Sequence, residues 1–118
     1  MSHFLSLVKP DSITMLKGTI VVTALKNAIE SREMVRLHYD PGERIVEPHA
    51  LGYGKDGQLL LRAFQVSGAS HSGDTSNWKL FRLDRMASAS GSGQSFSGPR
   101  DDYRQNDSAM KGGIIAQL

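Results

Sequence analysis

Three short apolar segments of this chain each contain arginine, and this pattern constrains the possible folds most. The segments are Arg44–Leu51, Gln58–Phe64 and Lys79–Met86. Arginine within a short strand is costly unless its guanidinium faces solvent, a partner side chain or an anionic ligand. The three segments therefore predict a small β-domain with a basic face, which points to a module that binds an anion or nucleic acid.

The overall composition is that of one modest domain. Hydrophobic residues make up 39% of the 118 residues, and no apolar run is long enough to span a membrane. Cysteine is absent, which excludes disulfides and cysteine-ligated zinc and fits the reducing cytoplasm, where we expect the protein. The formal net charge is only +2, so nucleic-acid binding would require local clustering of basic side chains.

The first part of the chain has helical periodicity. Apolar residues recur at three- and four-residue spacing from Ser12 to Ser31, and Pro10 suits a helix start. Gly18 and the β-branched run Thr19–Thr23 weaken the middle. The pattern is open between one kinked helix and a short turn followed by a helix over residues 22–31.

From Met34 the apolar period changes to two, which is typical of half-buried strands. We predict strands at residues 34–39, 44–51, 58–66 and 78–86, and a short fifth at 87–90. Pro48 indicates an edge position or a bulge. Residues 52–57 match G-x-G-x-x-G, but a strand follows them instead of a helix, so they predict a hairpin turn. The expected fold is mainly β, a small antiparallel barrel of four to five strands with an N-terminal helix.

Composition divides the chain into three parts. Residues 1–21 form a leader that could include a short helix, residues 22–90 form the β-domain, and residues 91–118 form a Gly/Ser-rich tail. Within the tail, residues 91–106 are interpreted as linker or disordered. Residues 112–116 form a small apolar patch that would either dock as a strand or contact a partner.

The candidate ligand-binding residues are basic or aromatic and lie in the predicted strands. A guanidinium fork donates two hydrogen bonds to one anion, and an aromatic ring beside basic groups suits single-stranded nucleic acid. The predicted contacts are Arg44, Arg82 and Arg85, a face formed by Arg36, His38, Arg62 and Phe64, and Trp78 at the rim.

Each of these candidates also has a structural alternative. Arg82 and Arg85 lie three residues apart in a predicted strand and should point to opposite faces, so one of them is expected to pair with Asp84 or Glu47. The face around Arg62 could be an ordinary solvated surface, and Trp78 could fill the core.

The sequence carries no pattern of catalysis. The four histidines show no metal-ligand spacing, and neither a nucleophile turn nor a P-loop is present. We therefore expect a protein that is not an enzyme and has no cofactor and no metal.

The order of these elements resembles the WYL domain over about residues 22–89. The resemblance rests on a strand ending in Tyr39, the spacing Arg44-x-Val46-x-Pro48-x-x-Leu51, a leucine-rich strand, and Phe81-Arg82-Leu83-Asp84-Arg85-Met86. It implies an Sm-like or SH3-like β-barrel of the kind found in bacterial and phage regulators. The Trp-Tyr-Leu triplet that names the family falls at residues 59–61, where only Leu61 is kept, so Phe64 or Trp78 would supply the aromatic contact.

The resemblance also implies a role in ligand sensing, for example in transcription or defence regulation. In this family a basic and aromatic groove accepts nucleic acid or a nucleotide-like effector and changes the activity of an attached or partner protein. By motif, Arg44, Arg82 and Arg85 are the positions carried over. The family usually places a winged-helix domain first, so we expect a stand-alone domain or a fragment of a longer regulator.

The alternative function is a protein–protein adaptor with an SH3-like barrel, and a homodimer could form through unpaired strand edges.

Overall fold

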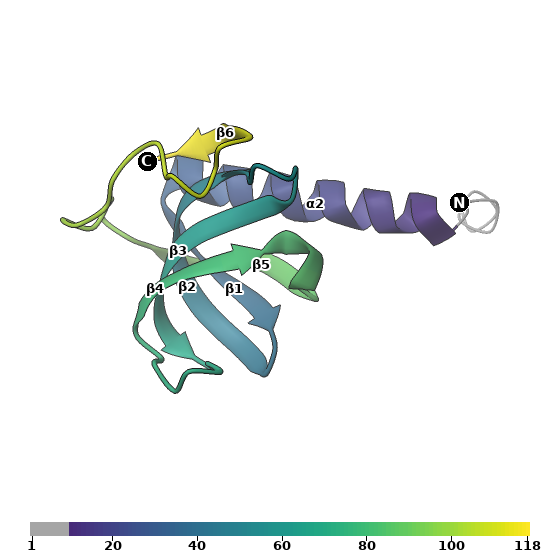
Figure 1. Cartoon of the computed structure of the whole chain (residues 1–118). Helices are drawn as coiled ribbons and strands as arrows, with labels where there is room; N and C mark the ends of the chain where they lie inside the picture. The colour runs from purple at the N-terminus through teal and green to yellow at the C-terminus, as the bar shows by residue number, and fades with distance from the viewer. Residues whose placement is uncertain (1–9) are drawn as a thin grey trace.

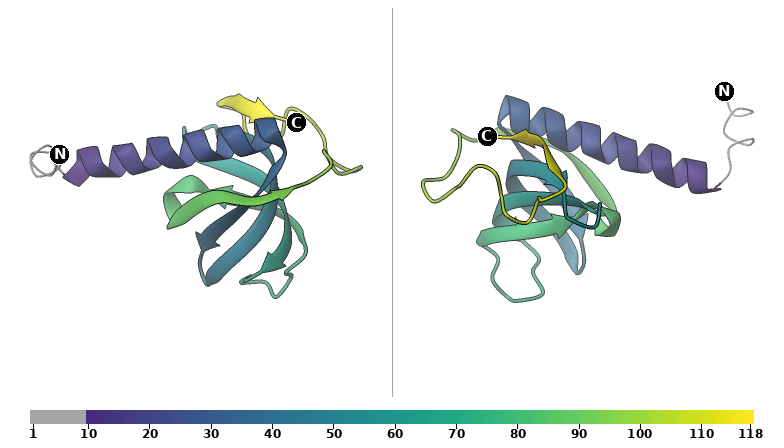
Figure 2. Two further views of the ribbon diagram at one scale, coloured as in Figure 1. Left: turned by 180° about the vertical axis from the view of Figure 1, so that it is seen from behind. Right: turned by 45° about the horizontal axis from the view of Figure 1, so that its top comes forward.

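A long helix lies across a curled antiparallel sheet in the computed structural model, which describes the backbone of residues 10–118 and the side chains of residues 17–118 (Figures 1 and 2). The elements are α2 (Pro10–Ser31), β1 (Glu33–Tyr39), β2 (Gly42–Tyr53), β3 (Leu59–Gly68), β4 (Asn77–Arg82), the 3-10 helix η1 (Leu83–Arg85), β5 (Ser88–Ser95) and β6 (Gly113–Gln117). Residues 1–9 of the predicted leader lie outside the described residues, and its remaining residues form the first part of α2.

Helix α2 is one helix that begins at Pro10, so the single-helix alternative is right. Only its C-terminal half packs on the sheet, where Leu25 and Ile29 are fully buried, whereas Ile20 is 66% exposed and the N-terminal half extends beyond the sheet (Figure 1). Arg32 then adopts a positive φ of 57° and turns the chain into β1. In the described part of the chain, no helix is both long and apolar enough to cross a membrane.

The sheet has six strands in the order β4-β3-β2-β1-β5, with β6 paired to β2. Strand β2 pairs with two strands along the same edge. Its first half pairs with β1, and its second half pairs with β6. The mainly β antiparallel class is confirmed. Closure into a barrel is not confirmed, because no pairing joins the β4 and β5 edges within residues 10–118.

Alternating side chains give the sheet two different faces. The inner face packs against α2 and contains Val35, Leu37, Val46, Leu61 and Phe81, all at most 1% exposed. The half-buried strands that the apolar period of two predicts are therefore present in β1 and β3. The outer face carries the polar and aromatic side chains that alternate with these residues along the same strands.

Two local predictions are confirmed by the strand register. The pairing of β2 with β3 shifts between Pro48 and Ala50, so the predicted bulge is present and His49 is its extra residue. The G-x-G-x-x-G match is a turn between antiparallel β2 and β3, in which Gly57 has a φ of 83° that favours glycine.

The C-terminal region differs from the linker interpretation. Residues 88–95 form β5 along β1, and residues 113–117 form β6 along β2, so the apolar end docks as a strand. Between them, residues 96–112, here called the strap, cross the outer face of the sheet. Phe96 and Met110, near the two ends of the strap, are at most 8% exposed, and these buried contacts with distant residues hold a segment that composition alone marks as mobile.

Arg44 is part of the core in this fold, not of an accessible basic face. It is 4% exposed, and its guanidinium donates hydrogen bonds to the carbonyl oxygens of Tyr39 (3.1 Å) and Asp40 (2.6 Å) and to Gln65 Oε1 (3.4 Å). It also lies 5.2 Å from the ring centre of Tyr39 and 5.5 Å from that of Phe81. Arg44 therefore ties the β1–β2 turn to β3 and β4, and burial lowers its pKa.

Replacing Arg44 should destabilise the domain. Arg44→Ala leaves buried acceptors without donors and opens a void beneath two rings, so the free energy of unfolding should fall by about 2–4 kcal/mol. Arg44→Lys should recover only part of this loss, because an ammonium group cannot donate in the same planar fork. Urea denaturation measures the stability of both variants. The control is Arg85→Ala, which changes an exposed residue of η1 and is expected to stay within about 0.5 kcal/mol of wild type. Equal stability of the Arg44→Ala and Arg85→Ala variants would contradict the structural role.

Candidate functional site

The outer face of β3 and β4 brings together three of the predicted ligand-binding residues. Phe64 pairs with Trp78 across the two strands, and Arg62 lies two residues from Phe64 on the same face. The Phe64 and Trp78 rings meet edge to face with centroids 5.5 Å apart. A guanidinium and two aromatic rings therefore lie side by side, as the alternation of β3 predicts.

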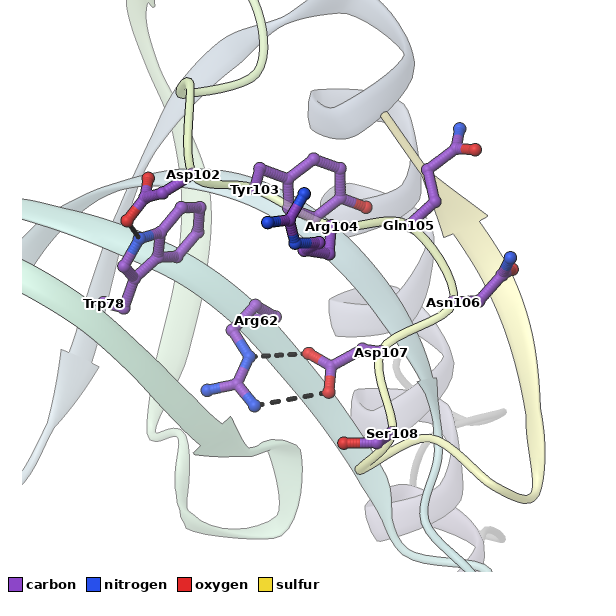
Figure 3. A pocket seen from close by; sticks show the side chains of 9 residues that line it. All are labelled: Arg62, Trp78, Asp102, Tyr103, Arg104, Gln105, Asn106, Asp107 and Ser108. Carbon is purple, nitrogen blue, oxygen red and sulfur yellow. Dashed lines mark hydrogen bonds and ion pairs between the residues drawn. The ribbon is translucent and has the colours of Figure 1, made fainter.

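The strap supplies partners to all three of these side chains. Arg62 donates two hydrogen bonds to Asp107, from Nε at 2.6 Å and from Nη2 at 3.3 Å. The Trp78 indole N–H donates to Asp102 Oδ2 at 2.9 Å (Figure 3). The guanidinium of Arg100 lies 3.6 Å from the ring centre of Phe64. The chain's own C-terminal segment thus occupies much of the face.

A second ion pair and a buried histidine lie beside this face. Arg100 donates from Nε to Glu47 Oε1 at 2.9 Å. His49 is fully buried, its Nδ1–H donates to the carbonyl oxygen of Glu47 (2.8 Å), and its Nε2 accepts from the backbone N–H of Arg100 (3.2 Å). These partners require the neutral imidazole with its proton on Nδ1. The rings of Trp78, Tyr103 and Phe96 surround it, with centroids at 4.7, 5.0 and 5.7 Å.

The electrostatics of the site follow from these contacts. Burial lowers the pKa of His49, and the charge of Arg100 acts in the same direction, whereas Glu47 and Asp102 oppose it. The hydrogen bond from Arg62 holds the pKa of Asp107 below its ordinary value. Burial raises the pKa of the Tyr103 hydroxyl, and the charge of Asp107 adds to this.

A cleft of about 410 Å³ opens between the strap and the sheet (Figure 3). Arg62 and Trp78 line it from the sheet, and residues 102–108 line it from the strap. The cleft offers a bidentate cation, an aromatic ring and the exposed Arg104, a set suited to an anionic ligand that contains a ring. Within residues 17–118, no group of three or more His, Asp or Glu side chains is placed to hold a metal ion.

The other predicted residues lie away from this cleft. Arg36 is on the outer face of β1, where it pairs with Glu43 at 2.8 Å, and His38 is exposed on the same strand. Arg82 forms two hydrogen bonds to Asp84, at 3.1 and 2.7 Å, so the predicted pairing with Asp84 is confirmed. The prediction that Arg82 and Arg85 lie in one strand and point to its opposite faces is wrong. Strand β4 ends at Arg82, and Arg85 lies in η1.

Several residues of the site could not be identified from the sequence patterns used. They are Glu47, His49, Arg100, Asp102, Tyr103 and Asp107. The available signal was the presence of isolated large apolar residues, Phe96, Tyr103 and Met110, in a segment otherwise rich in glycine, serine and charge. Such residues indicate anchor points, but they do not show which surface they contact.

The buried neutral His49 predicts a loss of stability in mild acid. Below about pH 6.5, the ordinary histidine pKa, the unfolded chain binds a proton at this residue while the folded chain, with its lowered pKa, does not. The contribution of His49 to the free energy of unfolding should therefore be fully present above that pH. It should be lost as the pH drops toward the folded-state pKa. Urea midpoints between about pH 7.5 and pH 5.5 should show this decrease.

The decrease should be smaller in His49→Gln, which cannot titrate. His38→Gln removes an exposed histidine and should keep the wild-type pH dependence. An unchanged slope in His49→Gln would show that another group is responsible.

Comparisons with known proteins give the chain a family. Residues 21–90 match the WYL domain. A solved structure with a similar fold is proteasome accessory factor B/C (PafBC) of Arthrobacter aurescens, with 27% sequence identity and a TM-score of 0.56. The similarity covers 77% of this chain but only 13% of the PafBC chain, and no curated protein matches. Because the family match covers more than half of the chain, this protein belongs to the WYL domain family of regulatory, ligand-sensing domains.

Proposed function

We propose that this protein is a non-catalytic regulatory domain that binds single-stranded nucleic acid or a nucleotide-like ligand and thereby modulates an attached or partner protein. The observation that carries the proposal is the outer face of β3 and β4, where Arg62 and Trp78 line the cleft from the sheet and Phe64 lies against Trp78. Membership of the WYL family supports a sensing role. The binding face is the outer face of β3 and β4.

The proposed contacts divide between charge and stacking. Arg62 already holds two N–H groups toward a carboxylate, and the same fork fits two oxygens of a phosphate. Trp78 offers a ring on which a base can stack, and Phe64 supports that ring from the side.

Four other predicted residues have a secondary place in this proposal. Arg36, His38, Arg82 and Arg85 are accessible at the surface and would contact phosphates of a longer strand outside the cleft. Arg44 is left out because its guanidinium is buried in the core.

We also propose that the curled sheet is a partly open form of the Sm/SH3-like barrel. The support is a contact between strands that are not neighbours in the sheet. Tyr39 of β1 meets Phe81 of β4 with ring centroids 5.0 Å apart, and its hydroxyl accepts a hydrogen bond from the Arg82 N–H at 3.4 Å. The interior is therefore bridged although the edges are not paired.

Binding can be tested by fluorescence anisotropy with labelled oligothymidylate of about twelve nucleotides, and with the matching RNA. Affinity should fall as salt is added, because phosphate contacts release counterions. Trp78→Leu should weaken binding at least about fivefold through lost stacking, which contributes roughly 1–3 kcal/mol per base. Lys26→Gln is the control, since this exposed residue of α2 lies outside the proposed binding face.

Two results would refute this function. One is the absence of binding to either oligonucleotide at low salt, and the other is an equal effect of Trp78→Leu and Lys26→Gln. The absence of binding would favour the alternative adaptor function. Its structural support is the unpaired edge of β4, where Leu80 is 40% exposed.

A further inference from the structure

We propose that the strap is a built-in mimic of the ligand, in which Asp107 takes the place of a phosphate on Arg62 and the ring of Tyr103 takes the place of a base beside Trp78. Strap and ligand would then compete for one face, and the ligand would bind when residues 100–109 move away. This inference rests on the proposed function and adds to it the chemistry of the ligand, an acidic group joined to a planar ring.

The acidic half of the mimic is the ion pair between Arg62 and Asp107. Both oxygens of the Asp107 carboxylate accept from the guanidinium, and the two side chains are 28% and 10% exposed. Arginine uses the same planar fork for carboxylates and phosphates. An incoming phosphate therefore needs the donor groups that Asp107 now holds, and the two cannot bind Arg62 in this way together.

The aromatic half of the mimic is Tyr103. Its ring is stacked beside that of Trp78, with centroids 6.1 Å apart and an interplanar angle of 27°. Asp102, the preceding residue, accepts from the indole N–H and fixes the edge of the same ring. A ring and two carboxylates of one short segment thus contact the two cleft residues to which the ligand contacts are assigned.

The strap is built so that its middle can leave while its ends stay. At one end the Phe96 N–H donates to the Arg32 carbonyl (2.9 Å), and at the other the Gly112 N–H donates to the Tyr53 carbonyl (2.9 Å). Phe96 and Met110 are buried at these ends. Between them, Asp101, Asp102 and Arg104–Asn106 are exposed, and the apolar packing is limited to the partly buried Tyr103 and Ala109. Segments with few buried apolar contacts open at low free-energy cost.

Competition also lowers the apparent affinity of the wild-type chain, because only molecules with the strap displaced can bind. Removing the strap carboxylates should therefore increase affinity, which is the opposite of what the loss of a ligand contact would do. This opposite sign separates a mimic from a strap that forms part of the binding site.

The test compares two double variants that remove the same charge. Asp102→Asn/Asp107→Asn weakens the mimic, whereas Asp56→Asn/Asp101→Asn changes two exposed carboxylates that form no hydrogen bond or ion pair within residues 17–118. Labelled oligothymidylate is titrated against each, after circular dichroism has shown that both are folded. The mimic variant should bind at least about tenfold more tightly than wild type, and the control variant about as wild type.

Adding Arg62→Gln to the mimic variant should abolish the gain. If the mimic variant and its charge-matched control gain equally, or neither gains, the mimic is refuted while binding itself stands. If no variant and no wild-type protein binds the oligonucleotide, the proposed function fails and the mimic fails with it.

Hydrogen exchange on the wild-type chain gives a second test that needs no variant. Saturating oligothymidylate should speed exchange of the Arg100 and Ala109 amides, which now donate to His49 Nε2 and Asp107 Oδ1. Amides between β2 and β3 should not become faster. Binding that leaves the Arg100 and Ala109 amides equally or better protected would overturn the proposal, because the strap would then have stayed in place.

Discussion

The bulge of β2 at His49 is the point on which the arrangement of the outer face depends. The extra residue turns its imidazole into the space between sheet and strap, where it bonds to the Glu47 carbonyl and to the Arg100 N–H. The carbonyl of His49 in turn accepts from the Leu118 N–H at 2.9 Å and from the Tyr103 hydroxyl at 3.3 Å. One residue therefore joins β2, the strap and the segment that follows β6. Without the shift in register, these groups would belong to the regular ladder between β2 and β3.

The charge on the outer face is balanced by segments distant in sequence. Strand periodicity predicts the place of Arg62 on this face, but its partner Asp107 lies on the strap, 45 residues away. A second pair has the opposite arrangement, with Arg100 on the strap and its partner Glu47 on β2, 53 residues away. A small net charge is thus compatible with a locally basic face on the sheet, because the carboxylate that compensates Arg62 lies on the strap.

The helix, the first four strands and the hairpin turn could be predicted from the sequence because each has its own local pattern of period or turn chemistry. The position of Arg44 could not, because an arginine inside a strand has the same pattern whether its partner is a ligand or a backbone carbonyl. Arg85 was misplaced because the chain leaves the strand after Arg82, which a run of alternating residues does not reveal. The strap could not be predicted because amino-acid composition carries no information on distant contacts, and Tyr103 is held by a hydrogen bond to His49, 54 positions away.

The departure of this chain from the family triplet has a physical counterpart in the strap. Leu60 stands at the middle position of the triplet, where the family has tyrosine, and it is 6% exposed in a small cluster with Ala50 and Met110. An aliphatic side chain at this position packs against Met110 at the far end of the strap. A buried tyrosine hydroxyl at the same position would be costly unless it had a hydrogen-bond partner. The aromatic surface is provided instead by Trp78 on the neighbouring strand, beside Phe64. The residue that anchors the far end of the strap therefore occupies the position at which the family triplet has its tyrosine.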